Sequence, residues 1–203
     1  MRKTEKNRKP PQNRAEQENK KPNYAFVDSQ NLNMSIISSG WKLDYRKFRL
    51  YLKNKYNVKE AYIFIGHVDG NESLYTNLQK SGYILVFKPT LEIKKNEETT
   101  VKGTVDAELV LHTMLEFDNY DKAVIVSGDG DFHCLIEYLE EEGKLLRLLT
   151  PNSRYSSLLR KFHKYIARLD LQKSKLEYKE KKERTQKKQN VQKNNVKKSV
   201  QKS

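Results

Sequence analysis

Residues 122–132 read KAVIVSGDGDF, and this stretch decides the fold class. Its first part, within the predicted strand 122–128, is apolar without alternation, as in a strand that is buried on both faces. The segment that follows, DFHCLIEYLEEEG (131–143), has the apolar spacing of an amphipathic helix and stops at a glycine. A buried strand followed directly by a helix is the repeating unit of a parallel sheet.

The same unit recurs through the middle of the chain. Apolar runs that predict strands occupy residues 24–28, 61–66, 83–89, 122–128 and 144–151, with a last short strand within 166–171. Helical spacing is found at 31–38, 44–56, 73–82, 104–117, 131–143 and 156–166. Residues 92–103 are polar and loop-like. The predicted fold class is therefore α/β, a Rossmann-like and mostly parallel central sheet with helices on both faces.

The positive charge of the chain lies in its two ends. The 203 residues carry a formal net charge of +14, of which residues 1–22 hold +5 and residues 172–203 hold +9. The middle is neutral and suits one domain over residues 23–171, flanked by a disordered basic tail and by a disordered or partly helical Lys-rich tail. Such tails attract RNA or an anionic membrane surface, or they serve only to keep the protein in solution.

Cysteine content and hydropathy limit the cellular compartments in which the protein is expected. The single cysteine, Cys134, excludes an intrachain disulfide and is expected to be a small core residue. The N-terminal residues lack the apolar run of a signal peptide, and no stretch approaches the roughly 20 apolar residues that span a bilayer. We therefore expect a cytoplasmic protein without a membrane span.

Four aspartates are candidates for a common acidic site. Asp28 ends the first predicted strand, and Asp129 and Asp131 follow the fourth. If these strands are neighbours, their carboxyl ends bring the side chains together, and Asp106 opens the helix that precedes the fourth strand. Clustered carboxylates repel one another, but a divalent cation stabilises them, and oxygen ligands suit Mg²⁺ or Mn²⁺.

Each of these residues also has a structural interpretation. Asp131 precedes a helix and could be its N-cap, and Asp129 could simply hold a turn. Asp28 with Asn31 could form an Asx-type turn that starts a helix. Asp106 lies in a first helical turn, where an acidic side chain is favourable next to the helix dipole.

Two common ligand-binding motifs are excluded. The stretch after Asp129 does not continue as a calcium loop, because Phe132 and His133 occupy the next positions. No glycine-rich nucleotide-binding or Walker-type loop follows any predicted strand, which excludes an ordinary Rossmann nucleotide-binding enzyme. Gly128 and Gly130 instead allow the backbone to turn tightly beside an ion.

Three segments in this order resemble the NYN domain family, also called LabA-like, within the PIN-like nuclease superfamily. They are FVDSQNL (26–32), KGTVDAELVLH (102–112) and VIVSGDGDFHCLIEYLEEEGK (124–144), and the resemblance covers roughly residues 23–170. It implies a PIN-like fold, an Mg²⁺ or Mn²⁺ site and RNA as the usual substrate. Carried over by motif, the catalytic residues would be Asp28, Asn31, Asp106, Asp129 and Asp131, and the four aspartates would be the metal ligands.

One position departs from the family pattern. Relatives often carry a further Asp about where His112 stands. The histidine could replace that carboxylate as a ligand, or it could be packed in the core. The number of metal ions, one or two, and the catalytic competence of the chain stay open for this reason.

The resemblance and the acidic cluster together predict a metal-dependent ribonuclease. One ion, held by Asp28, Asp129 and Asp131, would orient a phosphate oxygen and lower the pKa of a bound water. A second ion near Asp106 would stabilise the leaving 3′ oxygen, and by resemblance the products would be a 5′-phosphate and a 3′-hydroxyl. Asn31 would orient a ligand carboxylate or a substrate phosphate.

Single-stranded RNA is the expected substrate, because a cleft at strand ends admits a flexible backbone more easily than a stiff duplex. Ser127 could donate to a phosphate or to Asp28, or it could be an ordinary strand-end serine. Tyr155 could stack on a base or pack against a helix. A basic cluster after the fifth strand either contacts the RNA backbone or is only a solvated face; it consists of Arg154, Arg160, Lys161 and Lys164.

Two other functions are compatible with the sequence. The first is a non-catalytic RNA-binding module with a vestigial acidic site. The second is a regulatory interaction module that meets a protein partner through the sheet edge or the helix 131–142. Protein partners are unknown, and the sequence does not distinguish a monomer from a homodimer.

Overall fold

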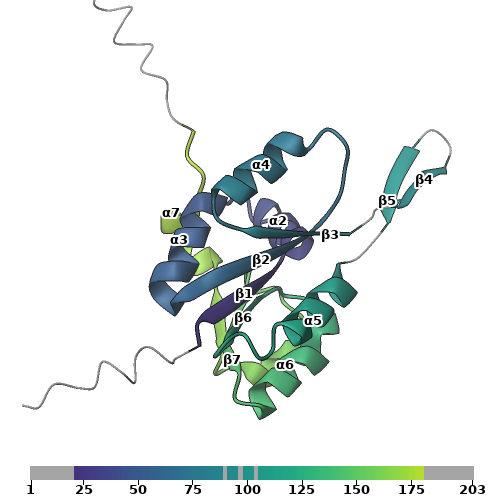
Figure 1. Cartoon of the computed structure of the whole chain (residues 1–203). Helices are drawn as coiled ribbons and strands as arrows, with labels where there is room; N and C mark the ends of the chain where they lie inside the picture. Colours follow the sequence, from purple (N-terminus) through teal and green to yellow (C-terminus); the bar gives the residue numbers. More distant parts are fainter. Residues whose placement is uncertain (1–20, 89–90, 96–97, 103–104, 181–203) are drawn as a thin grey trace, which may run out of the picture.

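A six-stranded sheet forms the centre of the molecule (Figure 1). The computed structural model describes residues 21–88, 91–95, 98–102 and 105–180. All neighbouring strands of the sheet pair in parallel, in the order β3-β2-β1-β6-β7-β8. The strands are β1 (Asn23–Asp28), β2 (Val58–Gly66), β3 (Ile84–Lys88), β6 (Ala123–Val126), β7 (Leu145–Thr150) and β8 (Ile166–Arg168). The predicted α/β fold with a Rossmann-like sheet is confirmed.

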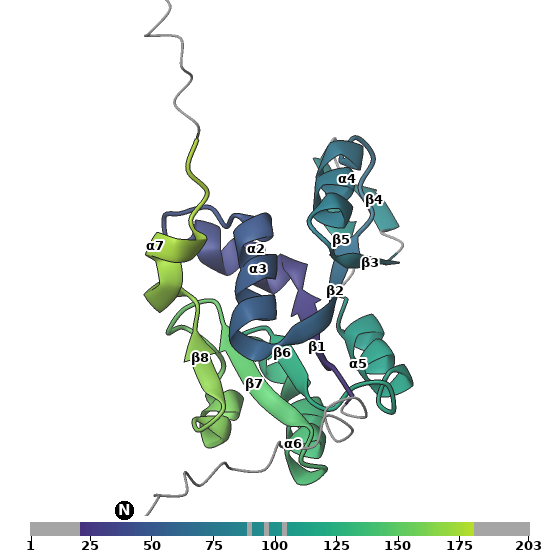
Figure 2. The same ribbon diagram turned by 60° about the vertical axis from the view of Figure 1, so that its left-hand side comes forward.

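Helices cover both faces of this sheet (Figure 2). One face packs against α2 (Ser29–Ile37), α3 (Tyr45–Tyr56), α4 (Glu72–Lys80) and α7 (Lys173–Leu176). The other packs against α5 (Asp106–Leu115), α6 (His133–Glu141) and the 3₁₀ helix η2 (Ser157–Phe162). Two further 3₁₀ turns, η1 (Gly130–Phe132) and η3 (Asp170–Gln172), lead into α6 and α7.

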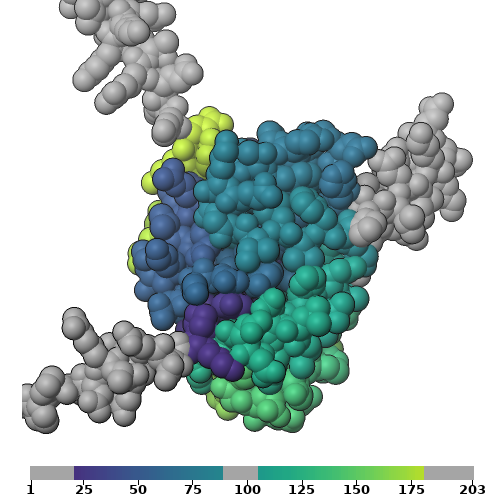
Figure 3. All heavy atoms as spheres, viewed as in Figure 1, coloured from purple at the N-terminus to yellow at the C-terminus, as the bar shows by residue number. Residues whose placement is uncertain are grey.

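The central strand β1 shows why its sequence does not alternate between apolar and polar residues. Ala25 and Val27 point into the core under α2 and α3, whereas Tyr24 and Phe26 point into the core under α5 and α6. Both faces are therefore buried, as in parallel sheets covered by helices on two sides. In Figure 3 only a small purple area of β1 reaches the surface, between the blue and green parts of the chain.

The strand order has a switch point between β1 and β6. From β1 the chain proceeds to β2 and β3 in one direction, and from β6 it proceeds to β7 and β8 in the other. The connections after β1 and β6 therefore diverge, and this switch point is where ligands bind in open parallel sheets. Asp28 at the end of β1 and Ser127 just after β6 lie there.

The structure differs from the sequence prediction in residues 92–103. This segment is not a loop: β4 (Leu91–Lys95) and β5 (Glu98–Lys102) pair as an antiparallel hairpin. A hairpin satisfies its backbone hydrogen bonds within itself, so it can form without the apolar run by which the buried strands were identified. The following helix, predicted from 104, begins at Asp106.

The expectation for Cys134 was wrong, because its side chain is exposed. The buried face of α6 consists of Leu135, Ile136 and Leu139. Position 134 precedes this stripe and therefore faces outward. Asp44 is the N-cap of α3, since its carboxylate accepts a hydrogen bond from the Lys47 amide at 3.0 Å.

The folded chain continues past Leu171, where the sequence pattern placed the end of the domain. Leu176 of α7 is 1% exposed, and its carbonyl accepts from the Asp44 amide at 2.9 Å. Tyr178 donates its amide to the Lys42 carbonyl at 2.9 Å. The tail predictions for residues 1–20 and 181–203 lie outside the described residues. Within the described part, no helix has the length and apolar character needed to cross a membrane.

Candidate active site

Asp28 connects two central strands at the switch point. Its Oδ1 accepts a hydrogen bond from the Asn31 amide at 3.1 Å, which makes Asp28 the N-cap of α2. Its Oδ2 accepts from the Ser127 hydroxyl at 3.0 Å. The residue is 3% exposed. The interpretation of Asp28 and Asn31 as a helix start is confirmed, and the same carboxylate is also oriented toward β6.

The loop after β6 is held against α2 by a continuous hydrogen-bond network. The amide of Gly128 donates to Asn31 Oδ1 at 2.9 Å, and the amide of Asp129 donates to the Ser127 hydroxyl at 3.1 Å. Because the Asn31 oxygen accepts a backbone hydrogen bond, its NH₂ group is the end that can donate to an anion. Asn31 and Ser127 therefore position the loop and orient Asp28.

The two aspartates after β6 have different surroundings. The Asp129 carboxylate accepts from the Asp131 amide at 3.1 Å and is the N-cap of η1. The cap that was considered for Asp131 thus belongs to Asp129, because the helix begins with the 3₁₀ turn at Gly130. Asp131 lies inside that turn and is exposed.

Negative charge concentrates around Asp28. Burial raises the pKa of the Asp28 carboxyl, and the hydrogen bonds from Asn31 and Ser127 oppose this shift. The charges of Asp106 and Asp129 raise the pKa of Asp28 further. The carboxylates of Asp106, in α5, and Asp129, after β6, thus act on Asp28 at the end of β1, whereas Asp131 is not among the groups that shift this pKa.

The carboxylate oxygens of Asp28 and Asp129 are ligands that suit a hard divalent cation, such as Mg²⁺, that keeps most of its coordinated water. No three His, Cys, Asp or Glu side chains of the described residues form a group that could hold a metal ion by themselves. Mg²⁺ is usually bound by one or two carboxylates, with water and substrate phosphate as its other ligands. Asp28 and Asp129 supply such a pair, because each carboxylate has lone pairs beyond those used in its hydrogen bonds.

His112 packs as an aromatic side chain. Its ring centroid lies 5.6 Å from that of Phe64 in an edge arrangement and 6.4 Å from that of Tyr62. Both partners belong to β2, under α5. This packing favours the interpretation of His112 as a core histidine over that of a replacement ligand.

Half of the predicted basic cluster is engaged in ion pairs. Lys161 pairs with Glu137, and Lys164 Nζ lies 2.7 Å from Glu140 Oε1. Both acids belong to α6, so these lysines join η2 to α6. Their charge is partly neutralised before any RNA binds, which weakens the case for them as backbone contacts.

The remaining members of the cluster, Arg154 and Arg160, are exposed. Arg154 directly precedes Tyr155, which lies beside the acidic loop (residues 127–131). A Cβ built on Gly128 of this loop would be 3.3 Å from Tyr155 Cβ. Tyr155 is half-buried and packs against the core under α6, which favours its packing role.

Ser156 was missed by the sequence analysis. Its amide donates to the Gly128 carbonyl at 3.0 Å, and a Cβ on Gly130 would lie 2.9 Å from Ser156 Cβ and still closer to its hydroxyl. The loop before η2 therefore presses against the acidic loop, which explains why position 130 is a glycine. The only available sequence signal was a serine in front of a helical run.

We expect Gly130→Ala to lower the free energy of unfolding by about 1–3 kcal/mol, because the added methyl group overpacks against Ser156. Urea denaturation measures this change. Combining it with Ser156→Ala should restore part of the loss, since one of the two clashing atoms is removed. Wild-type stability of Gly130→Ala would show that the two loops do not press on each other.

Comparisons with known proteins give a family model, a relative and a solved structure to which this chain is similar. The NYN domain family model matches residues 24–177. The low amplitude and bright protein LabA of Synechococcus elongatus is 25% identical over 142 residues, which are 66% of this chain and 76% of that protein. The crystal structure of a protein of unknown function from Vibrio parahaemolyticus superposes with a TM-score of 0.64 at 20% identity, covering 79% of this chain and 98% of that one. The latter likeness supports the fold alone.

Proposed function

The chain belongs to the NYN domain family, and from this premise we propose that it is a metal-dependent endoribonuclease that hydrolyses single-stranded RNA at the Asp28 site. One observation carries the proposal: a buried carboxylate lies among the charges of Asp106 and Asp129 at the ligand-binding end of the sheet. Such a cluster destabilises a protein unless a cation binds there. RNA follows from the family resemblance and from the strongly basic ends of the chain.

The mechanism assigns a role to each residue of the site. Asp28 and Asp129 would hold Mg²⁺ or Mn²⁺, which would supply positive charge and lower the pKa of a coordinated water. Ser127 keeps the Asp28 carboxylate oriented through its 3.0 Å hydrogen bond. Asn31 donates its NH₂ group to a phosphate oxygen, and its own oxygen stays on Gly128.

Bond making and breaking then follow ordinary hydrolysis. The oxygen of water forms a bond to phosphorus while the bond from phosphorus to the 3′ oxygen breaks. Asp106 accepts the proton that the water loses, and the leaving oxygen takes a proton from solvent. The products are a 3′-hydroxyl and a 5′-phosphate.

The alternative is a non-catalytic RNA-binding module. It is favoured by His112, which packs on Phe64 at a position where relatives often carry a carboxylate. In this case RNA would bind through the basic ends without being cut.

A cleavage assay separates the two functions. End-labelled single-stranded RNA is incubated with Mn²⁺, with Mg²⁺ or with a chelator, beside Asp129→Asn and the control Asp118→Asn. Asparagine retains the oxygen that caps η1, and Asp118 is an exposed loop residue before β6. We expect Asp129→Asn to reduce cleavage at least about 10²-fold, more than the loss of an outer-shell partner costs, and Asp118→Asn to leave it unchanged. If the wild-type protein is folded and binds the RNA but leaves it intact in the presence of Mn²⁺ or Mg²⁺, the proposed nuclease activity is contradicted.

A further inference from the structure

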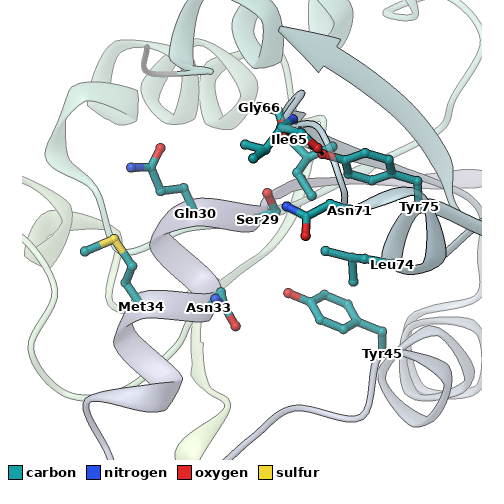
Figure 4. A pocket seen from close by; sticks show the side chains of 11 residues that line it. Ser29, Gln30, Asn33, Met34, Tyr45, Ile65, Gly66, Asn71, Leu74 and Tyr75 are labelled. Carbon is teal, nitrogen blue, oxygen red and sulfur yellow. Dashed lines mark hydrogen bonds between the residues drawn. The ribbon is translucent and has the colours of Figure 1, made fainter. Parts of the chain in front are cut away.

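A cavity lies between α2, the end of β2 and α4, and Ser29 is part of its wall (Figure 4). Its volume is about 310 Å³, at the lower end of the range of small-ligand sites. Ser29 is the residue after Asp28, and its hydroxyl donates to the Phe64 carbonyl at 2.6 Å. The cavity is thus one residue away from the proposed metal ligand.

The cavity has a polar but uncharged lining. None of the eleven lining residues is Lys, Arg, His, Asp or Glu. Gln30, Asn33 and Asn71 contribute amides, each with donors and an acceptor. The Tyr45 hydroxyl points into the cavity (Figure 4), and burial raises the pKa of Tyr45 to about 12, so this group stays neutral. A charged ligand would find no partner in this lining, whereas a neutral heterocycle with several hydrogen-bonding groups would.

Asn71 is the clearest sign that the cavity serves a ligand. It stands at the N-cap of α4, but its side chain makes no capping hydrogen bond. In Figure 4 its amide instead lies in the cavity, between Ser29 and Leu74. Asparagine at an N-cap usually accepts a hydrogen bond from the backbone of its own helix, but the Asn71 backbone (φ −97°, ψ 16°) is outside the extended conformation of such a cap. The amide is therefore directed toward the space where a ligand would sit.

The wall opposite α2 is rigid. The Tyr75 hydroxyl accepts from the Val68 amide at 2.8 Å and also contacts the carbonyl of Gly66. The Tyr75 ring packs edge-on against Phe87 with centroids 4.8 Å apart. The same ring also stacks with His67 at 5.7 Å. Tyr75 is therefore held in place, and with the apolar Leu74 it gives the cavity a preformed wall, which lowers the entropic cost of binding.

We propose that this cavity binds one nucleobase of single-stranded RNA, with an adjoining phosphate at Asp28; the inference rests on the proposed function and deepens it. A base is planar, neutral and edged with donors and acceptors, which matches the amides around Tyr45. Proteins that recognise single-stranded RNA take splayed bases in this way, by stacking and by hydrogen bonds to base edges.

A second hollow favours a polymer over a small molecule as the occupant. It has a volume of about 580 Å³ and shares Tyr45 and Leu74 with the first cavity. Arg46 and Lys80 line it together with one acid, Asp44, so its lining carries net positive charge, and Tyr178 is also part of its wall. The next nucleotides of the chain would meet cations for their phosphates as they leave the base cavity.

The test is a double-mutant cycle on binding. Fluorescence anisotropy in a chelator gives the Kd of a short single-stranded RNA and of copies in which successive positions are abasic. Asn33→Phe, on the exposed side of α2, fills the cavity, and Asn71→Ala removes its amide. Gln79→Phe and Gln79→Ala are matched controls on the exposed face of α4, outside both hollows. Circular dichroism and thermal melting check that each variant is folded.

We expect each cavity variant to raise the Kd about 10-fold and both controls to bind like wild type. One abasic position should weaken wild type by a similar factor but have no further effect on Asn33→Phe, because both changes remove the same contact. Wild-type affinity in both variants would overturn the base cavity. The same holds if the increases in Kd caused by Asn33→Phe and by the abasic position multiply, because the two changes would then act independently. If the non-additivity is found but no RNA is ever cleaved, the cavity is upheld and the nuclease proposal fails.

Discussion

We expect Asp28→Asn to abolish RNA cleavage and, without divalent metal, to make the protein more stable. Asparagine keeps the oxygen that accepts from the Asn31 amide, so the cap of α2 survives. It removes a negative charge that is 3% exposed and that lies near the charges of Asp106 and Asp129. Cleavage should fall at least about 10²-fold, since the loss of an outer-shell partner of a metal alone costs 10–100-fold.

The pH dependence of stability gives the sign of this effect. Burial, with the charges of Asp106 and Asp129, raises the pKa of Asp28 in the folded protein above its value of about 3.9 in the unfolded chain. The stabilising contribution of the protonated carboxyl is therefore fully present below the unfolded pKa and is lost as pH rises through the folded pKa. Thermal midpoints of the metal-free protein, measured from about pH 4 upward, should decline for wild type relative to Asp28→Asn.

Metal addition should reverse the order. Mn²⁺ should raise the melting temperature of wild type, because it binds the folded state, and should leave Asp28→Asn unchanged. The matched control is Asp44→Asn, which replaces another N-cap aspartate with the same amide contact, to Lys47, outside the acidic site. This control should retain the response to metal. Two outcomes would contradict the acidic site as described. One is a lower melting temperature for metal-free Asp28→Asn than for metal-free wild type, and the other is an equal rise in the melting temperatures of the two proteins with Mn²⁺.

The second large effect is expected from removing residues 181–203. This segment holds nine Lys and Arg against one Glu. If these cations neutralise RNA phosphates, each neutralised phosphate adds about 0.7 to the slope of log affinity against log salt for a single strand. Its deletion should flatten this slope and lower affinity at low salt by about 10²-fold or more. Titrations between about 50 and 200 mM salt measure both quantities.

The point of truncation matters. Ending the chain after Glu180 retains α7, whereas ending it after Leu171 removes Leu176, which is 1% exposed, and its hydrogen bond to Asp44. The shorter chain should be destabilised, by about 2–5 kcal/mol if the loss resembles a buried Leu→Ala change. Comparing the two separates lost charge from lost packing. Unchanged affinity and salt slope after deletion of 181–203 would mean that the tail does not contact RNA.

The sequence by itself determined the fold class and the region of the site. Strands buried on both faces have continuous apolar runs, and the helices between them have their own period, so the α/β order could be predicted from local patterns. The placement of Asp28 and Asp129 at strand ends followed from the same order, because parallel strands present their carboxyl ends at one edge. The resemblance of three segments to the NYN domain family led to the same region.

Only the tertiary structure decided which of the predicted residues meet. The charge of Asp129 acts on Asp28, whereas Asp131 is exposed, because Asp129 caps the 3₁₀ turn and Asp131 lies inside it. His112 packs on β2, and Lys161 is paired with α6. The proposed base cavity combines side chains of α2, α3, β2 and α4, all from residues 29–75. Local periodicity tells which residues of a helix are apolar, but it does not tell which other element packs against each face, and contacts of this kind depend on that packing.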